Sequence, residues 1–339
     1  MTALLLAAAL AAPVSAEAWA ADALSRAAAL LAGFARPAGA APPRPVQRAA
    51  PASRAPLIWR GAATTRLESA PEVSEPFDRA VVSWNADGPV LIELEAHGRW
   101  HTMGRWGARP ESVPGDPRVR VDTLALDAPA TALRWAVTPA PGTTVKLVAV
   151  TRWRDGDPIA DPAARSPAWG RVLAVPQRSQ TTESVDAARV CSPTSLGMVL
   201  VHHGVTRATR AVAQGVYDHA ARLYGNWPFN TAYAHSVSGL EAFVARAGFE
   251  ELEAEVAAGR PVIISHRWSP GELRGAPISS TDGHVIVVVG FTPDGDVVVN
   301  DPAARPGSVR RTYRRADLRR TWLEKGRGIA YFLRPAAAR

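Results

Sequence analysis

The stretch RVCSPTSLGMVL, residues 189–200, decides how the second half of this 339-residue chain folds. Its apolar residues recur at helical spacing, Pro193 suits the first turn of a helix, and Gly204 is a stop signal. Cys191, the single cysteine, therefore stands at a predicted helix N-terminus, where unpaired amides and the helix dipole lower a thiol pKa. Two interpretations remain open from this stretch alone: a reactive thiolate, or an inert cysteine that fills a gap in the core.

A second stretch, about ninety residues later, supplies a base and a carboxylate. The apolar runs 284–291 and 297–301, joined by the turn Pro293-Asp294-Gly295, predict an antiparallel hairpin. The entry of its first strand and the exit of its second lie side by side, so we expect His284 and Asp301 to share a hydrogen bond. A carboxylate on one imidazole nitrogen leaves the other nitrogen to take a thiol proton. This pattern favours a catalytic histidine over the alternative of a structural histidine at a strand end.

Two glutamines precede the cysteine, in VPQRSQ at residues 175–180. A neutral side-chain amide can stabilise the oxyanion of a tetrahedral intermediate without forming a permanent ion pair. From the residues alone, Gln177 and Gln180 are both candidates for this donor.

Taken in order, six segments resemble the C39-like peptidase family, a bacterial branch of the papain-like cysteine peptidases. They are VPQRSQ (175–180), VCSPTSLGMVL (190–200), YGNWPFNTAYA (224–234), GRPVIISH (259–266), DGHVIVVVGF (282–291) and VVVNDPA (297–303). The resemblance covers about half of the chain and implies a papain-like α+β fold with Cys191 as nucleophile, His284 as base and Asp301 as orienting residue. It implies Gln180 as the oxyanion donor, although eleven positions separate it from the cysteine, a longer gap than is usual, and Ser192 stands where many members carry glycine.

The first half of the chain has a different pattern, with short β runs bounded by turn residues and no helical periodicity. The runs lie at 57–59, 80–84, 90–95, 119–126, 133–137 and 145–150. They predict an all-β sandwich accessory domain over residues 56–155. Six of the eleven tryptophans fall in this region: Trp59, Trp84, Trp100, Trp106, Trp135 and Trp153. They either fill the core of the sandwich or form an aromatic platform for a cell-wall glycan.

The remaining segments complete the expected domain organisation. Residues 1–16, MTALLLAAALAAPVSA, predict a signal peptide, the alternative being an Ala-rich helix of the mature protein. Residues 17–55 and 156–169 predict linkers, and residues 170–336 the C39-like peptidase domain. We therefore expect a secreted or envelope-associated protein with no integral membrane segment after signal removal.

Composition excludes several classes of protein. A hydrophobic fraction of 47% is too high for a disordered chain, and one cysteine excludes both an intramolecular disulfide framework and a multi-cysteine zinc site. All but two of the 39 basic residues are arginines, spread evenly along the chain, so the net charge of +8 does not indicate a nucleic-acid surface. His202 and His203 point about 100° apart on a helix, and no carboxylate stands at ligand spacing, so we expect no metal site.

The expected function is a secreted cysteine peptidase that hydrolyses amide bonds of a peptide or protein substrate through a thioester, without a cofactor. Two alternatives stay open: a non-catalytic envelope binding protein, and a peptidoglycan endopeptidase or amidase that uses the same triad.

The roles of two segments are also left open by the sequence. The aromatic loop 224–230 either walls a substrate cleft or is pinned in the core, and the arginine run 310–320 is either a solvated face or a contact for an acidic polymer or substrate carboxylate.

Overall fold

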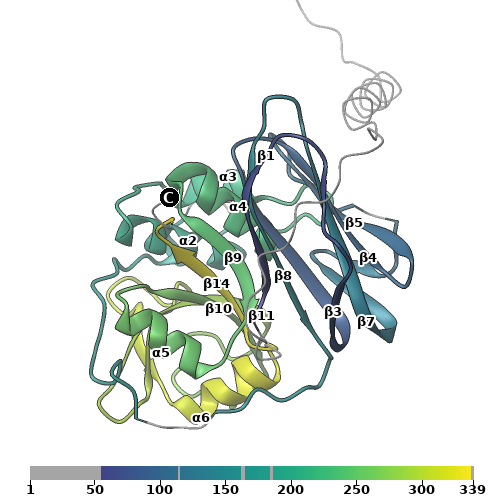
Figure 1. Ribbon diagram of the computed structural model, residues 1–339. Helices are drawn as coiled ribbons and strands as arrows, with labels where there is room; N and C mark the ends of the chain where they lie inside the picture. The colour runs from purple at the N-terminus through teal and green to yellow at the C-terminus, as the bar shows by residue number, and fades with distance from the viewer. Residues whose placement is uncertain (1–54, 114, 162–164, 184–185, 337–339) are drawn as a thin grey trace, which may run out of the picture. The chain divides into compact units, whose positions relative to one another are not determined.

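Two antiparallel sheets organise the part of the chain that the computed structural model describes, residues 55–113, 115–161, 165–183 and 186–336 (Figure 1). The predicted signal peptide (1–16) and nearly all of the first predicted linker (17–55) lie outside the described residues. No helix among the described residues combines the length and apolar character needed to cross a membrane.

The first sheet takes up the region that the sequence predicts to be all-β. Its eight strands are β1 (Leu57–Ala63), β2 (Leu67–Glu68), β3 (Glu72–Ala86), β4 (Val90–Ala96), β5 (Arg99–Trp106), β6 (Val119–Arg120), β7 (Thr123–Pro139) and β8 (Val145–Trp153). They form one hydrogen-bonded path, β1-β8-β3-β7-β4-β5, with β2 and β6 also paired to β7. Two separate sheets, as a β-sandwich implies, are therefore not shown by the strand pairing. β5 was not predicted, because its residues carry no run of β-branched side chains.

One hydrophobic core lies beneath this path. Alternate residues of β4 are buried, the pattern of a strand with one face on a core. Four tryptophans, Trp84, Trp106, Trp135 and Trp153, are at most 9% exposed. Trp84, Trp106 and Trp135 belong to this core, whereas Trp153 packs in the core of the second half of the chain. All four are buried, so the platform interpretation is wrong for them. Trp59 and Trp100 are only half-buried.

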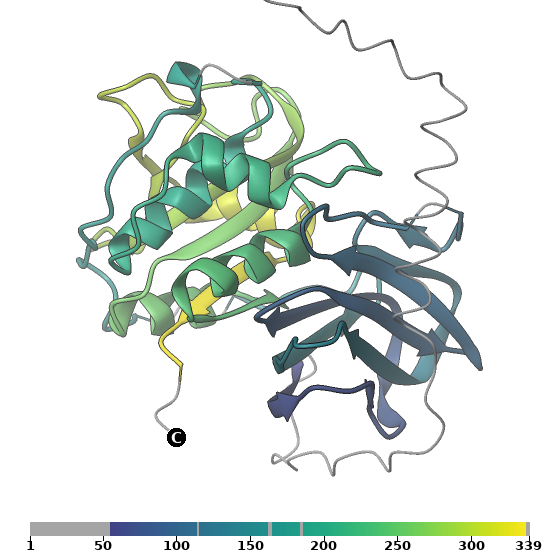
Figure 2. The same ribbon diagram turned by 90° about the horizontal axis from the view of Figure 1, so that it is seen from above.

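The second sheet is built by the latter half of the chain. Its elements are the short helix η1 (Gln180–Thr182), α2 (Cys191–His202), α3 (Thr209–Val216), α4 (Trp227–Ser238), β9 (Glu241–Arg246), α5 (Phe249–Ala257), β10 (Val262–Trp268), β11 (Thr281–Phe291), β12 (Val297–Asn300), β13 (Arg310–Tyr313), α6 (Arg315–Leu318), η2 (Arg319–Glu324) and β14 (Ile329–Arg334). The strand order is β13-β12-β11-β10-β14-β9. β12 and nearly all of β11 and β14 are buried on both faces, because helices cover this sheet from both sides (Figures 1 and 2).

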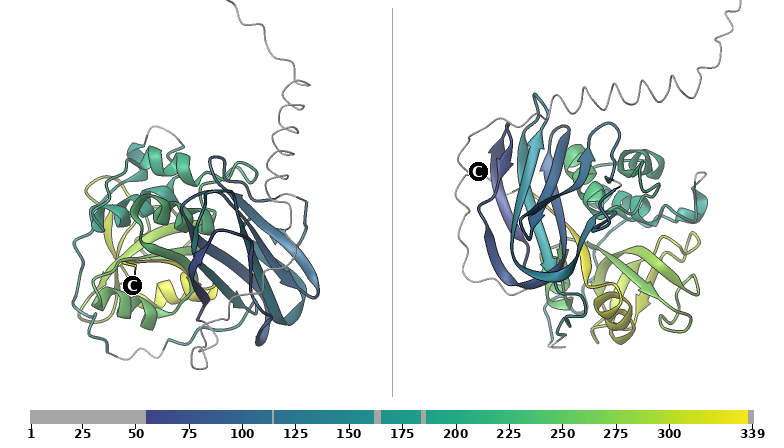
Figure 3. Two further views of the ribbon diagram at one scale, coloured as in Figure 1. Left: turned by 45° about the horizontal axis from the view of Figure 1, so that its top comes forward. Right: turned by 90° about the vertical axis from the view of Figure 1, so that its right-hand side faces the viewer.

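The edge strand β9 lies beside the first sheet (Figures 1 and 3), and buried polar side chains of that sheet bond to its backbone. The Asn85 amide donates to the carbonyl of Ala242 at 2.6 Å and accepts from its N–H at 3.0 Å. Ser83 and Thr151 bond the N–H and the carbonyl of Val244 in the same way, at 3.1 and 2.9 Å. These side chains satisfy backbone groups that an edge strand otherwise leaves open, so the two sheets belong to one compact unit.

The aromatic loop 224–230 also joins the two sheets. Phe229, at the start of α4, is 1% exposed and packs in the core of the first sheet, with its ring 6.1 Å from that of Trp84 and 5.8 Å from that of Trp106. The backbone N–H of Trp227 donates at 2.9 Å to Asp122, in the turn between β6 and β7. For Phe229 the structure therefore supports the pinned alternative.

Candidate active site

The single cysteine begins helix α2, as the sequence predicts. Burial raises the pKa of the Cys191 thiol, but a hydrogen bond to His284 and its positive charge outweigh burial and lower the pKa below its usual value. The backbone N–H groups of Val285 and Ser192 act in the same direction. The site therefore favours the thiolate, which is the nucleophilic form of cysteine.

His284 and Asp301 come together through the predicted hairpin. β11 and β12 pair antiparallel with Val287 opposite Asn300, which sets the two side chains next to one another. His284 Nε2 donates to Asp301 Oδ1 at 2.8 Å. The other ring nitrogen, Nδ1, is left for the side-chain hydrogen bond with Cys191. The structure thus brings together three of the four predicted side chains in one hydrogen-bonded line.

Asp301 is held in place by neighbours other than the histidine. The hydroxyl of Tyr313 donates to Asp301 Oδ2 at 2.6 Å, and the backbone N–H of Ala303 donates to Oδ1 at 2.9 Å. Burial raises the pKa of this carboxyl, but His284 and the Tyr313 hydrogen bond lower it to about 2. Asp301 is therefore ionised at neutral pH although it is fully buried.

The charge on Asp301 decides the protonation of His284. Burial lowers the pKa of the imidazole, but the charges and hydrogen bonds of Asp301 and Cys191 raise it to about 10. At neutral pH the resting site therefore holds an imidazolium beside a carboxylate, next to a thiol whose pKa is lowered. Each buried charge has an oppositely charged neighbour, which burial of ions requires.

The two candidate glutamines lie in different surroundings. Gln180 is 6% exposed, and its backbone N–H donates at 2.8 Å to the carbonyl of Pro302, the residue after Asp301. Its amide Nε2 donates to the carbonyl of Ala187 at 2.9 Å, and its Oε1 has no protein partner among the described residues. Gln177 Oε1 instead accepts from the backbone N–H of Arg310 on the edge strand β13.

Sequence reasoning missed two residues beside the site. Tyr313 lies inside the arginine run, and only the antiparallel pairing of β13 with β12 brings its hydroxyl to Asp301. His266 stands opposite His284 in the β10–β11 pair, with the ring centroids 5.8 Å apart. Burial, followed by the charge on His284, lowers the His266 pKa to about 3, so this second histidine is neutral. The GRPVIISH segment by itself does not indicate which strand it pairs with, so the sequence did not predict that His266 lies opposite His284.

The arginine run is only in part the solvated face that its sequence favours. Arg314 and Arg319 are exposed. Arg315 is 12% exposed and pairs with Asp161 and Glu253, both at 2.7 Å, and Arg310 donates to Asn300 Oδ1 at 3.0 Å. Arg315 and Arg310 point inward because buried carboxylate and amide oxygens accept hydrogen bonds from them. The order of charges along the sequence does not show which arginines have such partners.

Of the two neighbouring histidines at the end of α2, His202 bonds a backbone carbonyl, whereas the Nε2 of His203 has no partner among the described residues. His202 Nε2 lies 2.9 Å from the carbonyl of Gly259, and burial lowers the pKa of His203. Within the described part of the chain, no group of three or more His, Cys, Asp or Glu side chains has the arrangement of a metal site.

Comparison with known proteins gives a family and several solved structures. Residues 172–329, just under half of the chain, match the model of the Peptidase_C39 like family. A solved double glycine motif protease from an AMS/PCAT transporter, in complex with the leader peptide, is 21% identical, with a TM-score of 0.34. The match covers 51% of this chain and 100% of that one. No curated protein matches the sequence.

Proposed function

We propose that this chain, whose residues 172–329 belong to the Peptidase_C39 like family and form a cysteine peptidase domain, cleaves peptide bonds through Cys191, His284 and Asp301. The observation that carries the proposal is the hydrogen-bonded line from sulfur to imidazole to carboxylate. A thiol nucleophile needs a base to take its proton and a carboxylate to orient that base, and His284 and Asp301 stand in these places.

The reaction follows from the resting charges. The Cys191 thiolate attacks the carbonyl carbon of the substrate, and the carbonyl oxygen becomes an oxyanion. As the C–N bond breaks, His284 Nδ1 gives its proton to the leaving amine, and a thioester remains on the sulfur. Neutral His284 then takes a proton from water, the hydroxide attacks the thioester, and the acid product leaves as the thiolate returns. Asp301 keeps its negative charge throughout and holds the ring by Nε2.

We assign the oxyanion contact to Gln180 rather than Gln177. Two facts support this assignment: Gln180 is buried beside Pro302, at the Asp301 end of the sheet, and the side-chain oxygen of Gln177 is bonded to β13. An Nε2 group has two hydrogens, and the bond to Ala187 uses one of them. The second hydrogen is free to donate to the oxyanion.

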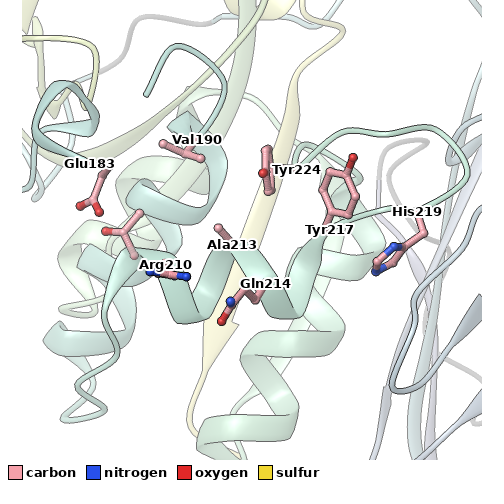
Figure 4. A pocket seen from close by; sticks show the side chains of 9 residues that line it. Glu183, Val190, Arg210, Ala213, Gln214, Tyr217, His219 and Tyr224 are labelled. Carbon is pink, nitrogen blue, oxygen red and sulfur yellow. The ribbon is translucent and has the colours of Figure 1, made fainter. Parts of the chain in front are cut away.

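A cavity of about 420 Å³, whose lining includes neither Cys191 nor His284, is the proposed place for a substrate side chain (Figure 4). Val190, the residue before Cys191, forms part of its wall. Tyr217 and Tyr224 line one end with rings 4.9 Å apart, and Arg210 and Glu183 line the other (Figure 4). A peptide side chain with an apolar body and a polar tip fits such a lining.

We further propose that the first sheet folds over as a β-sandwich accessory domain and that the protein is secreted. The shared core of Trp84, Ile92, Trp135 and Val148, contributed by four different strands, supports a sheet that closes on itself. Export rests on the sequence of residues 1–16 alone. N-terminal sequencing of the exported protein tests it, with Glu17 as the expected first residue and Met1 as the result that refutes it.

The decisive experiment is labelling of the full chain with an epoxide inhibitor of cysteine peptidases, followed by mapping of the modified residue and a peptide-library assay. We expect modification of Cys191, cleavage of library peptides, and loss of both in Cys191→Ala. An unlabelled thiol together with no cleavage would favour the non-catalytic envelope binding protein. Clearing of purified cell walls would identify the peptidoglycan endopeptidase or amidase.

A further inference from the structure

Ser192, the residue after the candidate nucleophile, has a buried hydroxyl with two partners. It donates to Asn230 Oδ1 of α4 at 3.0 Å and lies 3.4 Å from the hydroxyl of Tyr331 in β14. The side chain is 1% exposed, so no solvent competes for these bonds. The backbone N–H of the same residue acts on the Cys191 sulfur. The hydroxyl therefore anchors the peptide group that faces the thiolate.

The anchor continues as a chain of buried polar groups that leads away from the site. Asn230 Nδ2 donates to the carbonyl of Asn226 at 2.8 Å, and Asn226 Nδ2 donates to Asp218 Oδ2 at 2.9 Å. Asp218 Oδ1 accepts from the backbone N–H of Ser112 at 3.1 Å, and Ser112 belongs to the region of the first sheet. The three side chains are at most 1% exposed.

The orientation of the Asn230 side-chain amide is fixed by its own hydrogen bonds. Asn230 Nδ2 also donates to the carbonyl of Tyr224 at 2.8 Å, so a flipped amide would set its oxygen against two carbonyl oxygens. Only the observed orientation leaves Asn230 Oδ1 free to accept from Ser192. The serine hydroxyl is thereby committed as a donor to α4 and as an acceptor from Tyr331.

We infer that Ser192 is a positioning residue for Cys191, and that the chain Asn230–Asn226–Asp218 ties this position to the region of the first sheet through Ser112. The inference rests on the proposed function, because positioning matters only if the thiolate is the nucleophile. It also assigns the first-sheet region a part in holding the active site, in addition to any ligand it binds.

The test is the rate of iodoacetamide alkylation of the full chain as a function of pH. Cys191 is the only cysteine, so alkylation reports on one thiol without a need for substrate. In Ser192→Ala the peptide that faces the sulfur loses its anchor, so we expect the alkylation midpoint to move to higher pH. Alkylation near pH 6 should slow about fivefold, the size of one helix-terminus interaction, and kcat should fall by a similar factor with KM unchanged.

Matched variants separate positioning from stability. Thr194→Val removes another buried hydroxyl of α2, one that bonds the carbonyl of Val190 at 2.7 Å, and should leave the midpoint in place. Tyr331→Phe removes one hydroxyl and should move the midpoint in the same direction as Ser192→Ala, by less. Asp218→Asn tests the far end of this series of hydrogen bonds, and we expect a still smaller shift of the alkylation midpoint.

The outcomes are distinct for the two proposals. If Ser192→Ala and Tyr331→Phe fold and keep the wild-type midpoint, the positioning role is refuted, whatever the peptidase assay gives. If Ser192→Ala fails to fold, the alkylation midpoint of Tyr331→Phe decides whether the positioning role holds. If the wild-type chain cleaves no peptide but the midpoint shifts as expected, the proposed function fails and the anchoring of the thiol stands.

Discussion

Two buried polar clusters, at the sheet junction and at the candidate site, differ in charge. At the junction, Asn85, Ser83 and Thr151 are fully buried and neutral, and they bond backbone groups of β9. At the site, His284 and Asp301 are ionised and the pKa of the Cys191 thiol is lowered, with the pKa values of the three groups moved by one another. Neutral, satisfied groups contribute to stability, whereas buried charges held by their neighbours are available for chemistry. If this difference holds, substitutions in one cluster change catalysis and substitutions in the other change stability.

The largest expected effect is the loss of catalysis in Cys191→Ala, a substitution that should leave folding unchanged. Cys191→Ala removes the nucleophile, so turnover should fall by at least about 10³-fold, to the background of substrate binding alone. The free energy of unfolding, measured by urea titration, should stay within about 1 kcal/mol of wild type. A variant that unfolded instead would mean that the charged cluster also holds the fold together.

Asp301→Asn should be the next most severe change in activity. The amide cannot stabilise the imidazolium and can hold the ring in the wrong tautomer, so kcat should fall about 10²- to 10⁴-fold. Stopped-assay kinetics on a library peptide measure this. Tyr313→Phe, which removes one hydrogen bond to Asp301 Oδ2, is the matched weaker change and should cost about tenfold.

The junction should respond in the opposite way. Asn85→Ala leaves the N–H and the carbonyl of Ala242 without partners in a buried place, so the free energy of unfolding should fall by about 3 kcal/mol. The activity per folded molecule should stay unchanged. Ser74→Ala, on an exposed part of the same strand β3, is the control and should change stability by less than about 0.5 kcal/mol. A loss of kcat in folded Asn85→Ala would break the separation.

The pH profile sharpens the description of the charged cluster. A protonated thiol is inert, so kcat/KM should rise with pH on the acidic limb as Cys191 ionises. The leaving amine needs the proton of His284, so the rate should fall on the alkaline limb near pH 10. In Asp301→Asn the imidazolium loses its largest stabilising partner, and the alkaline limb should move to lower pH. An unmoved limb would contradict the assigned role of Asp301.

The two clusters also differ in how far the sequence revealed them. The helix start at Cys191 and the hairpin of His284 and Asp301 are local patterns, and local patterns are what periodicity and turn residues report. The partners Asn85–Ala242, Ser192–Asn230 and Tyr313–Asp301 are set by packing between distant elements, for which a single sequence carries no register. The sequence alone left two environments open for Phe229, a hydrophobic core or the wall of a cleft. Its place in the core of the first sheet depends on how α4 packs against that sheet.

The smallest effect is expected for His266, which lies beside the charged cluster but resembles the neutral one. Burial and the charge of His284 keep it uncharged, its Nε2 has no hydrogen-bond partner among the described residues, and its ring lies 4.7 Å from that of Trp268. His266→Phe keeps the ring contact, so kcat/KM should stay within about threefold and stability within about 1.5 kcal/mol. The alkaline limb is the sensitive readout. If it moved clearly, the proton on His284 would depend on its histidine neighbour as well as on Asp301, and the charged cluster would have four members.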